Sequence, residues 1–407
     1  MKLMDALFYR HEGEQISEGV MKALGGGEIR GSVSRLETYA TCGYRYFLQY
    51  LLQIQERREH AFEAVDMGSL YHDALEKYEH ALLEANEDWQ TITPERSEEL
   101  LQQSIRLAYE QMEKAESFDN ARENYIRTHM EKTLRRTVWA LTKQVRAGSF
   151  VPSQFEVSLR ELGDEGSLHY PLDNGMELQL GGVIDRVDTF TVDDTLYIKV
   201  IDYKSSGKDV NPSDLYHGLQ IQLIFYMNAV LKAKAAKGIP ASPAAVLYYH
   251  INDPMIRGDY HTTNDALEQE ILKELKVKGL VNASEVVIEG LDKEIYEKGV
   301  SQVIPVKIKK DHTPDANSKV ATEEEFKLLT DFVEKKVTDL GNRIASGDIA
   351  ALPYCKKSRT GCDYCEYHSI CGFDPRMDGY EYRRLMEYKD GDAYEKMREE
   401  LDDGVDR

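Results

Sequence analysis

Two strand-like segments joined by a short hairpin constrain the fold of this chain more than any other feature. The first, GGVIDRVDTF, covers residues 181–190, and the second, LYIKVIDYK, covers residues 196–204. So short a connection makes the two strands neighbours in an antiparallel sheet. Because side chains alternate between the faces of a strand, Asp202 and Lys204 share the face of Val200. A buried strand that ends in a carboxylate and an ammonium group needs an explanation.

The preceding strand supports a first explanation, a metal-binding site. Asp185 and Asp188 are three positions apart and so lie on opposite faces, and the pattern places Asp185 beside Asp202. Two carboxylates next to Lys204 form an oxygen-rich site that suits Mg²⁺ or Mn²⁺. In the alternative, Asp202 and Lys204 form an ordinary ion pair at a strand end. Asp185 then pairs with Arg186 or Lys204 and has no further role.

The bulk properties describe a water-soluble protein of more than one region. A length of 407 residues exceeds what one compact core usually covers, and 42% of the residues are hydrophobic and 30% charged. No apolar run approaches the ~20 residues of a membrane span, and the N-terminus lacks a signal peptide. We therefore expect a cytoplasmic protein without a membrane partner. The net charge of −21 argues against a nucleic-acid partner, which usually has a basic surface, although an acidic metal site and an acidic C-terminal tail both contribute to this charge.

The order of the expected elements indicates an α/β fold, a small mixed sheet flanked by helices, with helical elaborations. Strand patterns fill residues 153–204 and recur in AAVLYYHI, while the segment 255–320 has no clear period. Helices are expected over residues 34–56, 66–86, 94–117, 120–147, 213–236 and 322–346.

Three helical residues could join the carboxylates. Gln222 and Tyr226 are four positions apart and share a helix face, where they could orient a phosphate or the lysine. His72, in GSLYHDALE, could bind the metal. Alone, each of these residues is more typical of an ordinary core, boundary or surface position.

The cysteines form a second candidate site. Cys362, Cys365 and Cys371 crowd the C-terminal region, and Cys42 precedes them by about 320 residues. Four thiolates suit zinc or an iron–sulfur cluster, and spacing alone does not separate the two. Unligated buried thiols are the remaining alternative. Cys355 lies outside this group, and we expect it not to be a ligand.

Together these motifs resemble the RecB-like PD-(D/E)XK nucleases. The residues that carry the resemblance are His72 in GSLYHDALE, Asp185 in GGVIDRVD, Asp202 and Lys204 in VIDYKSS, and the QLIFY segment. The cysteines in SVSRLETYATCGYRYF and GCDYCEYHSIC narrow it to nucleases with an iron–sulfur staple, closest to the C-terminal nuclease regions of AddB-type subunits of AddAB helicase–nucleases. The resemblance covers residues 30 to 385.

The resemblance implies a Mg²⁺-dependent DNA exonuclease that processes double-strand ends for recombinational repair. It implies metal ligation by His72, Asp185, Asp202 and the Tyr203 carbonyl, catalysis by Lys204, and a [4Fe–4S] cluster. The cluster ligands would be Cys42, Cys362, Cys365 and Cys371. The implied substrate is a single strand fed from a duplex end and cut 5′ to 3′, and the implied partner is an AddA-like helicase–nuclease subunit.

Alternative functions remain at this point. The chain has no GxxxxGK[ST] loop, and its lead-in reads like a helix that joins something upstream, so we expect a fragment of a longer subunit. The alternatives are a stand-alone RecB-like single-strand exonuclease and a non-catalytic module that binds DNA ends. Basic side chains could contact DNA or be merely solvated: Arg127, Arg135, Arg136, Lys143, Arg146, Lys356, Lys357 and Arg359.

These expectations divide the chain into six regions. A linker or upstream remnant at 1–30 precedes a helical region at 31–150, which carries Cys42 and His72. The catalytic core occupies 151–255. An elaboration with a long helix (256–350), the cysteine cluster (351–385) and an acidic tail (386–407) follow.

Overall fold

A six-stranded mixed sheet forms the centre of the protein, in the order β2-β5-β6-β7-β8-β9. The computed structural model describes residues 15–25, 27–55, 64–111, 121–162, 168–258 and 262–405. The predicted hairpin is confirmed, since β5 pairs antiparallel with β6, and β7 lies parallel to β6 on its other side. The strands are β2 (Val151–Ser158), β5 (Val183–Val192), β6 (Thr195–Lys204), β7 (Ala241–His250), β8 (Lys278–Asn282) and β9 (Val320–Ala321).

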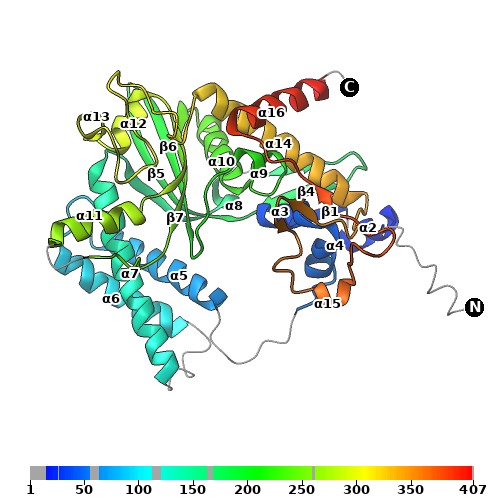
Figure 1. Cartoon of the computed structure of the whole chain (residues 1–407), viewed down its shortest axis with the longest axis horizontal. Coiled ribbons are helices and arrows are strands. Elements are labelled where there is room, and N and C mark those ends of the chain that lie inside the picture. Colours follow the sequence, from blue (N-terminus) through cyan, green and yellow to red (C-terminus); the bar gives the residue numbers. More distant parts are fainter. Residues whose placement is uncertain are drawn as a thin grey trace, which may run out of the picture.

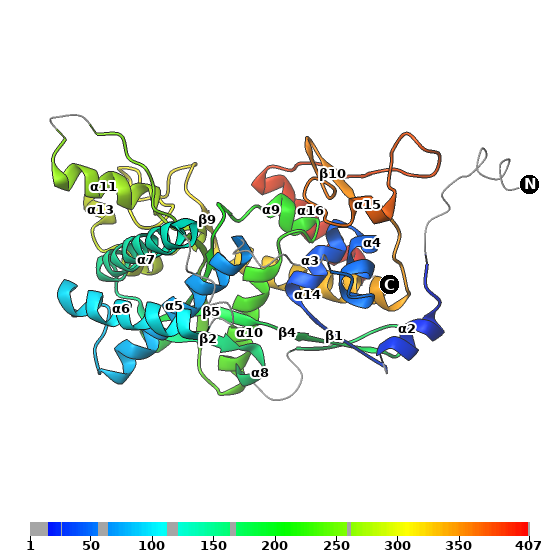
Figure 2. The ribbon, with the colours of Figure 1, turned by 90° about the horizontal axis from the view of Figure 1, so that it is seen from below.

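Helices cover both faces of this sheet, which confirms the predicted α/β class (Figures 1 and 2). Strand β7 is buried on both of its faces, which explains why its sequence is one apolar run. Its residues Val246 and Tyr248 belong to one buried cluster, and Leu247 and Tyr249 belong to another. The first cluster includes α3 (Val33–Thr41), α10 (Gln222–Ala236) and α14 (Glu323–Ala345). The second includes α5 (Ala64–Glu84), α6 (Pro94–Gln111), α7 (Ala121–Ala147) and α12 (Glu285–Leu291).

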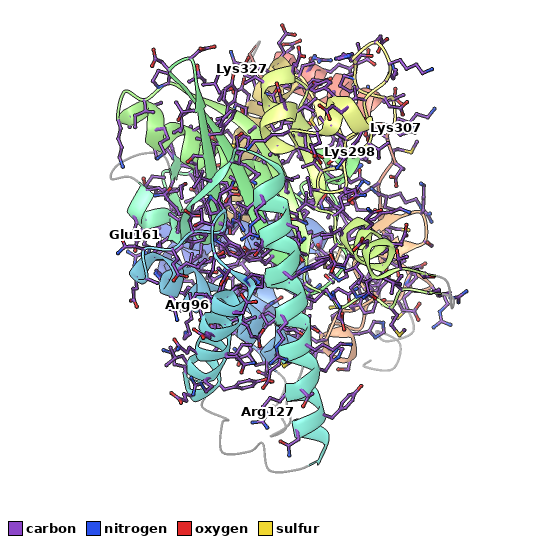
Figure 3. The ribbon with its side chains drawn as sticks, turned by 90° about the vertical axis from the view of Figure 1, so that its left-hand side faces the viewer. Arg96, Arg127, Glu161, Lys298, Lys307 and Lys327 are labelled. Carbon is purple, nitrogen blue, oxygen red and sulfur yellow. The ribbon has the colours of Figure 1, made fainter. Side chains whose placement is uncertain are left out.

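Figure 3 shows α7 running along the outside of the second layer, with Arg127 near the end where the helix begins. Apolar residues at helical spacing, among them Leu134, Val138 and Leu141, are buried against that layer. The predicted helix over 120–147 is thereby confirmed within the described residues.

A second, three-stranded sheet joins segments that are distant in sequence. Strand β1 (Glu28–Ser32) pairs parallel with β4 (Glu177–Gly181), which also pairs with β3 (His169–Pro171). The described part of residues 1–30 thus carries helix α2 (Glu18–Gly25) and the beginning of a strand. The sequence EIRGS did not indicate this pairing, because its partner strand β4 lies about 150 residues later.

The N-terminal helices α3 and α4 (Gly43–Tyr46) lie beside the C-terminal segment that carries β10 (Tyr354–Lys356) and α15 (His368–Cys371) (Figures 1 and 2). The backbone N–H of Tyr44 donates to the carbonyl of Ala350 at 3.2 Å. The Tyr367 hydroxyl donates to the carbonyl of Ile54 at 2.8 Å. A π-helix (Phe47–Leu51) follows α4, and β10 pairs with β11 (Arg359–Thr360) and β12 (Arg383–Arg384).

The helix predicted over 213–236 is two helices. The first, α9 (Pro212–Tyr216), is followed by Gly218 with φ of +77°, and the chain then turns into α10. This left-handed conformation ends the first helix and favours glycine. The other helices are α8 (Leu159–Leu162), α11 (Asn264–Glu274), α13 (Ile295–Lys298) and α16 (Asp390–Val405). Among the described helices, none has both the length and the apolar composition that a membrane crossing requires.

Candidate active site

Three side chains from three elements converge at the end of the central hairpin. His72 lies on α5, Glu156 on β2 and Asp185 on β5, and one ligand atom of each falls within 4.8 Å of the others. The Nδ1 atom of His72 lies 3.7 Å from Oε1 of Glu156 and 3.6 Å from Oδ2 of Asp185. An imidazole and two carboxylates are a ligand set for a divalent cation.

A hydrogen bond from the other ring nitrogen of His72 fixes the orientation of the imidazole. Nε2 lies 3.1 Å from the carbonyl oxygen of Tyr203, which can only accept a hydrogen bond, so Nε2 donates. In the neutral ring the lone pair of Nδ1 then faces the two carboxylates. Burial lowers the pKa of His72, but Glu156 and Asp185 raise it further than burial lowers it. The Tyr203 carbonyl, predicted as a metal ligand, also accepts the hydrogen bond that orients this histidine.

Glu156 is the member of the cluster that the sequence did not reveal. It lies between the pairs Phe155↔Arg186 and Val157↔Ile184, where the register of β2 with β5 continues unchanged, and its φ is +43°. A left-handed conformation is costly for a glutamate within a strand, and such strain is typical of functional positions. In sequence, Glu156 is one glutamate of many in a strand-like run.

Asp185 and Asp202 lie together at the paired ends of β5 and β6. Oδ2 of Asp185 accepts a hydrogen bond from the backbone N–H of Tyr203 at 2.5 Å. Burial, and then the charge of Asp202, raise the pKa of Asp185 to about 7. Two carboxylates held so close favour either a proton or a cation between them.

Asp202 carries the clearest sign of an absent ligand. Its side chain is almost fully buried, and its Oδ2 accepts no hydrogen bond within the described residues. The Nζ atom of Lys204 lies 2.5 Å from Oδ2, in an ion pair whose angles do not make a hydrogen bond. Because this buried carboxylate oxygen accepts no hydrogen bond, a cation bound to it would stabilise its negative charge in addition to Lys204.

Asp188, on the opposite face of β5, has a different role. Its carboxylate is fully buried and accepts hydrogen bonds from Nε and Nη2 of Arg186 at 2.6 and 2.9 Å. Lys199 adds an ion pair at 2.6 Å. Arg186 therefore pairs with Asp188 and not with Asp185, and the assignment of the two aspartates to opposite faces holds.

Gln222 and Tyr226 lie at the beginning of α10, on the side of the sheet that faces Asp202. Nε2 of Gln222 donates to the Tyr226 hydroxyl at 3.0 Å. Burial raises the pKa of Tyr226, and Asp202 and Asp185 raise it further, so the hydroxyl stays protonated. A Cβ atom at Gly182 would lie 3.1 Å from this hydroxyl, so a larger residue there would crowd it.

The cysteines lie where α3 and α4 meet the C-terminal segment. Cys42 is the last residue before α4, and Cys371 ends α15. Burial raises the pKa of Cys362 to about 12, with further contributions from the neighbouring thiols of Cys42, Cys365 and Cys371. The thiol of Cys355 instead donates a hydrogen bond to the carbonyl of Lys357 at 3.6 Å. None of the five cysteines forms a disulfide.

The basic residues proposed for DNA contact mostly have acidic partners. Arg135 pairs with Glu98 at 2.7 Å, and Arg136 pairs with Asp253 at 3.4 Å. Arg146 donates to the backbone carbonyls of Trp89 and Ile92.

Lys356, which the sequence analysis named as a possible DNA contact, lies inside the fold. It is buried, with Asp214 and Glu387 as ion-pair partners, the second at 3.3 Å. Its ammonium group is thus used within the fold, whereas Lys357 remains largely exposed.

The fold and the site define a nuclease class. Residues 30–372 match the PD-(D/E)XK nuclease superfamily, and the chain belongs to this superfamily. Among curated proteins, it is similar to several that are named as the B subunit of an ATP-dependent helicase/deoxyribonuclease. That of Caldanaerobacter subterraneus subsp. tengcongensis is 36% identical over 386 residues, which are 94% of this chain and 33% of that protein.

Two further relatives carry the same name. The relative from Bacillus subtilis (strain 168) is 34% identical over 402 residues, which cover 98% of this chain and 34% of the relative. That of Thermoanaerobacter sp. (strain X514) is 33% identical over 410 residues, which cover 100% of this chain and 35% of the relative. The chain spans about a third of the length of these relatives.

Proposed function

We propose that this chain is a Mg²⁺- or Mn²⁺-dependent deoxyribonuclease that hydrolyses phosphodiester bonds of DNA. The observation that carries the proposal is the ligand group of His72, Glu156 and Asp185, next to a buried oxygen of Asp202 that pairs with Lys204 and accepts no hydrogen bond. Such a group suits a hard divalent cation. When bound, the cation supplies Lewis-acid chemistry, neutralising charge that develops on the phosphoryl oxygens.

The residues of the chain have distinct roles in this proposal. His72, Glu156, Asp185 and Asp202 hold the cation. Lys204, whose ammonium group is partly exposed at the end of β6, orients the attacking water and stabilises the transition state. Gln222 and the protonated Tyr226 position the lysine or the DNA backbone.

We further propose that the chain is the nuclease part of an AddAB-type helicase–nuclease in the cytoplasm. Its relatives are named as the B subunit of an ATP-dependent helicase/deoxyribonuclease, and the chain matches about a third of each. The proposed partner is an AddA-like subunit. The proposed substrate is a single strand fed from a duplex end and cut from 5′ to 3′, a polarity that rests on the resemblance alone.

The four cysteines are proposed to hold a structural [4Fe–4S] cluster. The thiols of Cys42, Cys362, Cys365 and Cys371 perturb one another electrostatically although Cys42 is distant in sequence. The raised pKa values of Cys42 and Cys362 disfavour free thiolates at these two positions, whereas a bound metal would stabilise the thiolate forms. The cluster would join α4 to α15 across the contacts already described.

Cleavage of labelled single-stranded DNA by Asp202→Ala tests the proposed nuclease. We expect Mg²⁺-dependent cleavage to fall by at least roughly 100-fold, the scale of losing one electrostatic group in a catalytic site. Binding of the same DNA in EDTA should stay within about twofold of the parent. Lys22→Ala, a change at an exposed residue of α2, is the control. Equal cleavage by Asp202→Ala would refute the proposal, and absence of cleavage by the parent with intact binding would favour a non-catalytic module that binds DNA ends.

A further inference from the structure

Five lysines surround a cavity at the edge of the central sheet, away from the carboxylates. The cavity has a volume of about 360 Å³ and lies between the end of α11 with β8 and the segment 300–319. Its lining includes a single acidic side chain, Glu274, within the described residues. In a chain with a net charge of −21, such a local excess of positive charge is unusual. We call this site the lysine groove: Lys273, Lys276, Lys278, Lys307 and Lys319.

The charges of the groove are only partly neutralised from within the fold. Lys319 pairs with Asp390 at 3.2 Å, and Lys273 pairs with Glu270 at 3.4 Å. Lys278 and Lys307 are exposed, and neither has an ion-pair partner in the part of the chain that the structure describes. Figure 3 shows Lys307 at the periphery of the molecule. Both ammonium groups are therefore available to an external anion.

Lys276 is affected by the positive charges that surround it in the lysine groove. Its Nζ donates to the carbonyl of Ser301 at 2.7 Å. Burial lowers its pKa, and the neighbouring charge of Lys273 lowers it further. A bound anion would relieve this repulsion between like charges.

The groove continues towards the candidate active site. Lys319 also lines a second cavity of about 410 Å³, which contains Gly207 and Lys208. These two residues follow Lys204 by three and four positions, directly after β6. Two of the aspartates in this second cavity already have partners, since Asp214 binds Lys356 and Arg359 and Asp390 binds Lys319.

We propose that the lysine groove binds the phosphate backbone of the single DNA strand on its way to or from the catalytic carboxylates. The proposal rests on the proposed nuclease function and adds to it a path for the substrate. The remaining walls are aliphatic or small and polar, as at Val277, Pro305 and Ser318, and the described lining has no aromatic side chain. Without a surface on which bases can stack, recognition is through phosphates, so binding is independent of sequence and sensitive to salt.

The test is a titration of fluorescent oligo(dT) against salt, in EDTA so that no cleavage occurs. The variant is Lys278→Gln/Lys307→Gln, and the matched control is Lys22→Gln/Lys237→Gln, two exposed lysines, the first on α2 and the second directly after α10. Losing two phosphate contacts on a single strand should reduce the slope of log K against log[salt] by roughly 1.4. At 0.1 M salt this corresponds to an affinity roughly 25-fold weaker, if the curves converge near 1 M.

A second measurement does not depend on variants. Lysine acetylation of the parent protein, read by mass spectrometry with and without oligo(dT), should show protection of Lys278 and Lys307 but not of Lys237. Equal affinity and slope for the two double variants, or no protection, would overturn the proposal. A parent that fails to cleave DNA but shows both effects would refute the nuclease and retain the groove.

Discussion

The carboxylate of Glu37 caps the helix that begins at Gln222. Its Oε1 accepts the backbone N–H groups of Ile221 and Gln222, at 2.8 and 2.9 Å. Glu37 lies on α3, five residues before Cys42, and its Oε2 is 4.0 Å from Lys208. One buried side chain thus links the helix before the cysteine site with the helix that carries Gln222 and Tyr226.

Glu37→Ala should impair both stability and catalysis. It leaves two N–H groups without an acceptor in a buried setting, which costs about 1–3 kcal/mol of unfolding free energy. Because α10 then loses its fixed first turn, we expect kcat to fall more than KM rises. Glu37→Gln retains an acceptor oxygen and should restore most of both. Thermal unfolding and steady-state cleavage measure the effects, and a glutamine variant as impaired as the alanine variant would contradict this role.

Glu156→Gln tests the ligand that only the structure reveals. Removing one of the anionic ligands should weaken metal affinity, so that roughly tenfold more Mg²⁺ is needed for half-maximal cleavage, the lower end of the loss typical of altered metal surroundings. Maximal cleavage at saturating Mg²⁺ should recover in part. Glu161→Gln, at an exposed glutamate of the following short helix, is the control. An unchanged Mg²⁺ requirement would remove Glu156 from the site.

Asp188→Asn should strongly destabilise the fold. The change leaves the buried charges of Arg186 and Lys199 without their carboxylate, which costs on the order of 3–5 kcal/mol. A large drop in Tm at pH 7 is therefore expected. An unchanged Tm would mean that the buried ion pairs contribute little.

The same aspartate predicts how stability depends on pH. Burial raises the pKa of Asp188, but Arg186 and Lys199 outweigh burial and hold it below its ordinary value. The native state therefore favours the carboxylate, and the stability that it contributes is fully present above about pH 4, the ordinary pKa. It is lost as the pH falls through the lower native pKa. The difference in Tm between the parent and Asp188→Asn should accordingly shrink below about pH 4.

Cys365→Ser tests the nature of the cysteine site. For an iron–sulfur cluster, anaerobically purified parent should have broad visible absorbance that the variant lacks. The variant should also unfold locally, with faster proteolysis between α4 and α15, because ligand binding and folding are coupled there. Cys355→Ser, which leaves the proposed ligands intact, should keep the absorbance. A colourless parent with stoichiometric zinc would refute iron–sulfur and retain a metal staple.

The sequence was sufficient for features that depend on local pattern. The period of two along β5 and β6 separated Asp185 from Asp188, and the short hairpin placed the strands side by side. Both follow from backbone geometry within about twenty residues. The carboxylates and Lys204 were therefore identifiable before their surroundings were known.

Features that depend on distant partners were not predictable in this way. Lys356 reads as an exposed basic residue until Asp214, 142 positions earlier, is found beside it. Glu156 becomes distinctive only through its φ and its place opposite β5. The pairing of β1 with β4 likewise requires a partner that no local pattern specifies.

The contact of α4 with the segment around Ala350 has a consequence for synthesis of the chain. About 300 residues separate Tyr44 from Ala350, and at 5–20 residues per second the ribosome needs roughly 15–60 s to make them. During that interval α3 and α4 lack the surface that covers them. Completion of this part of the molecule is therefore a late event, limited by translation and not by the local speed of helix formation.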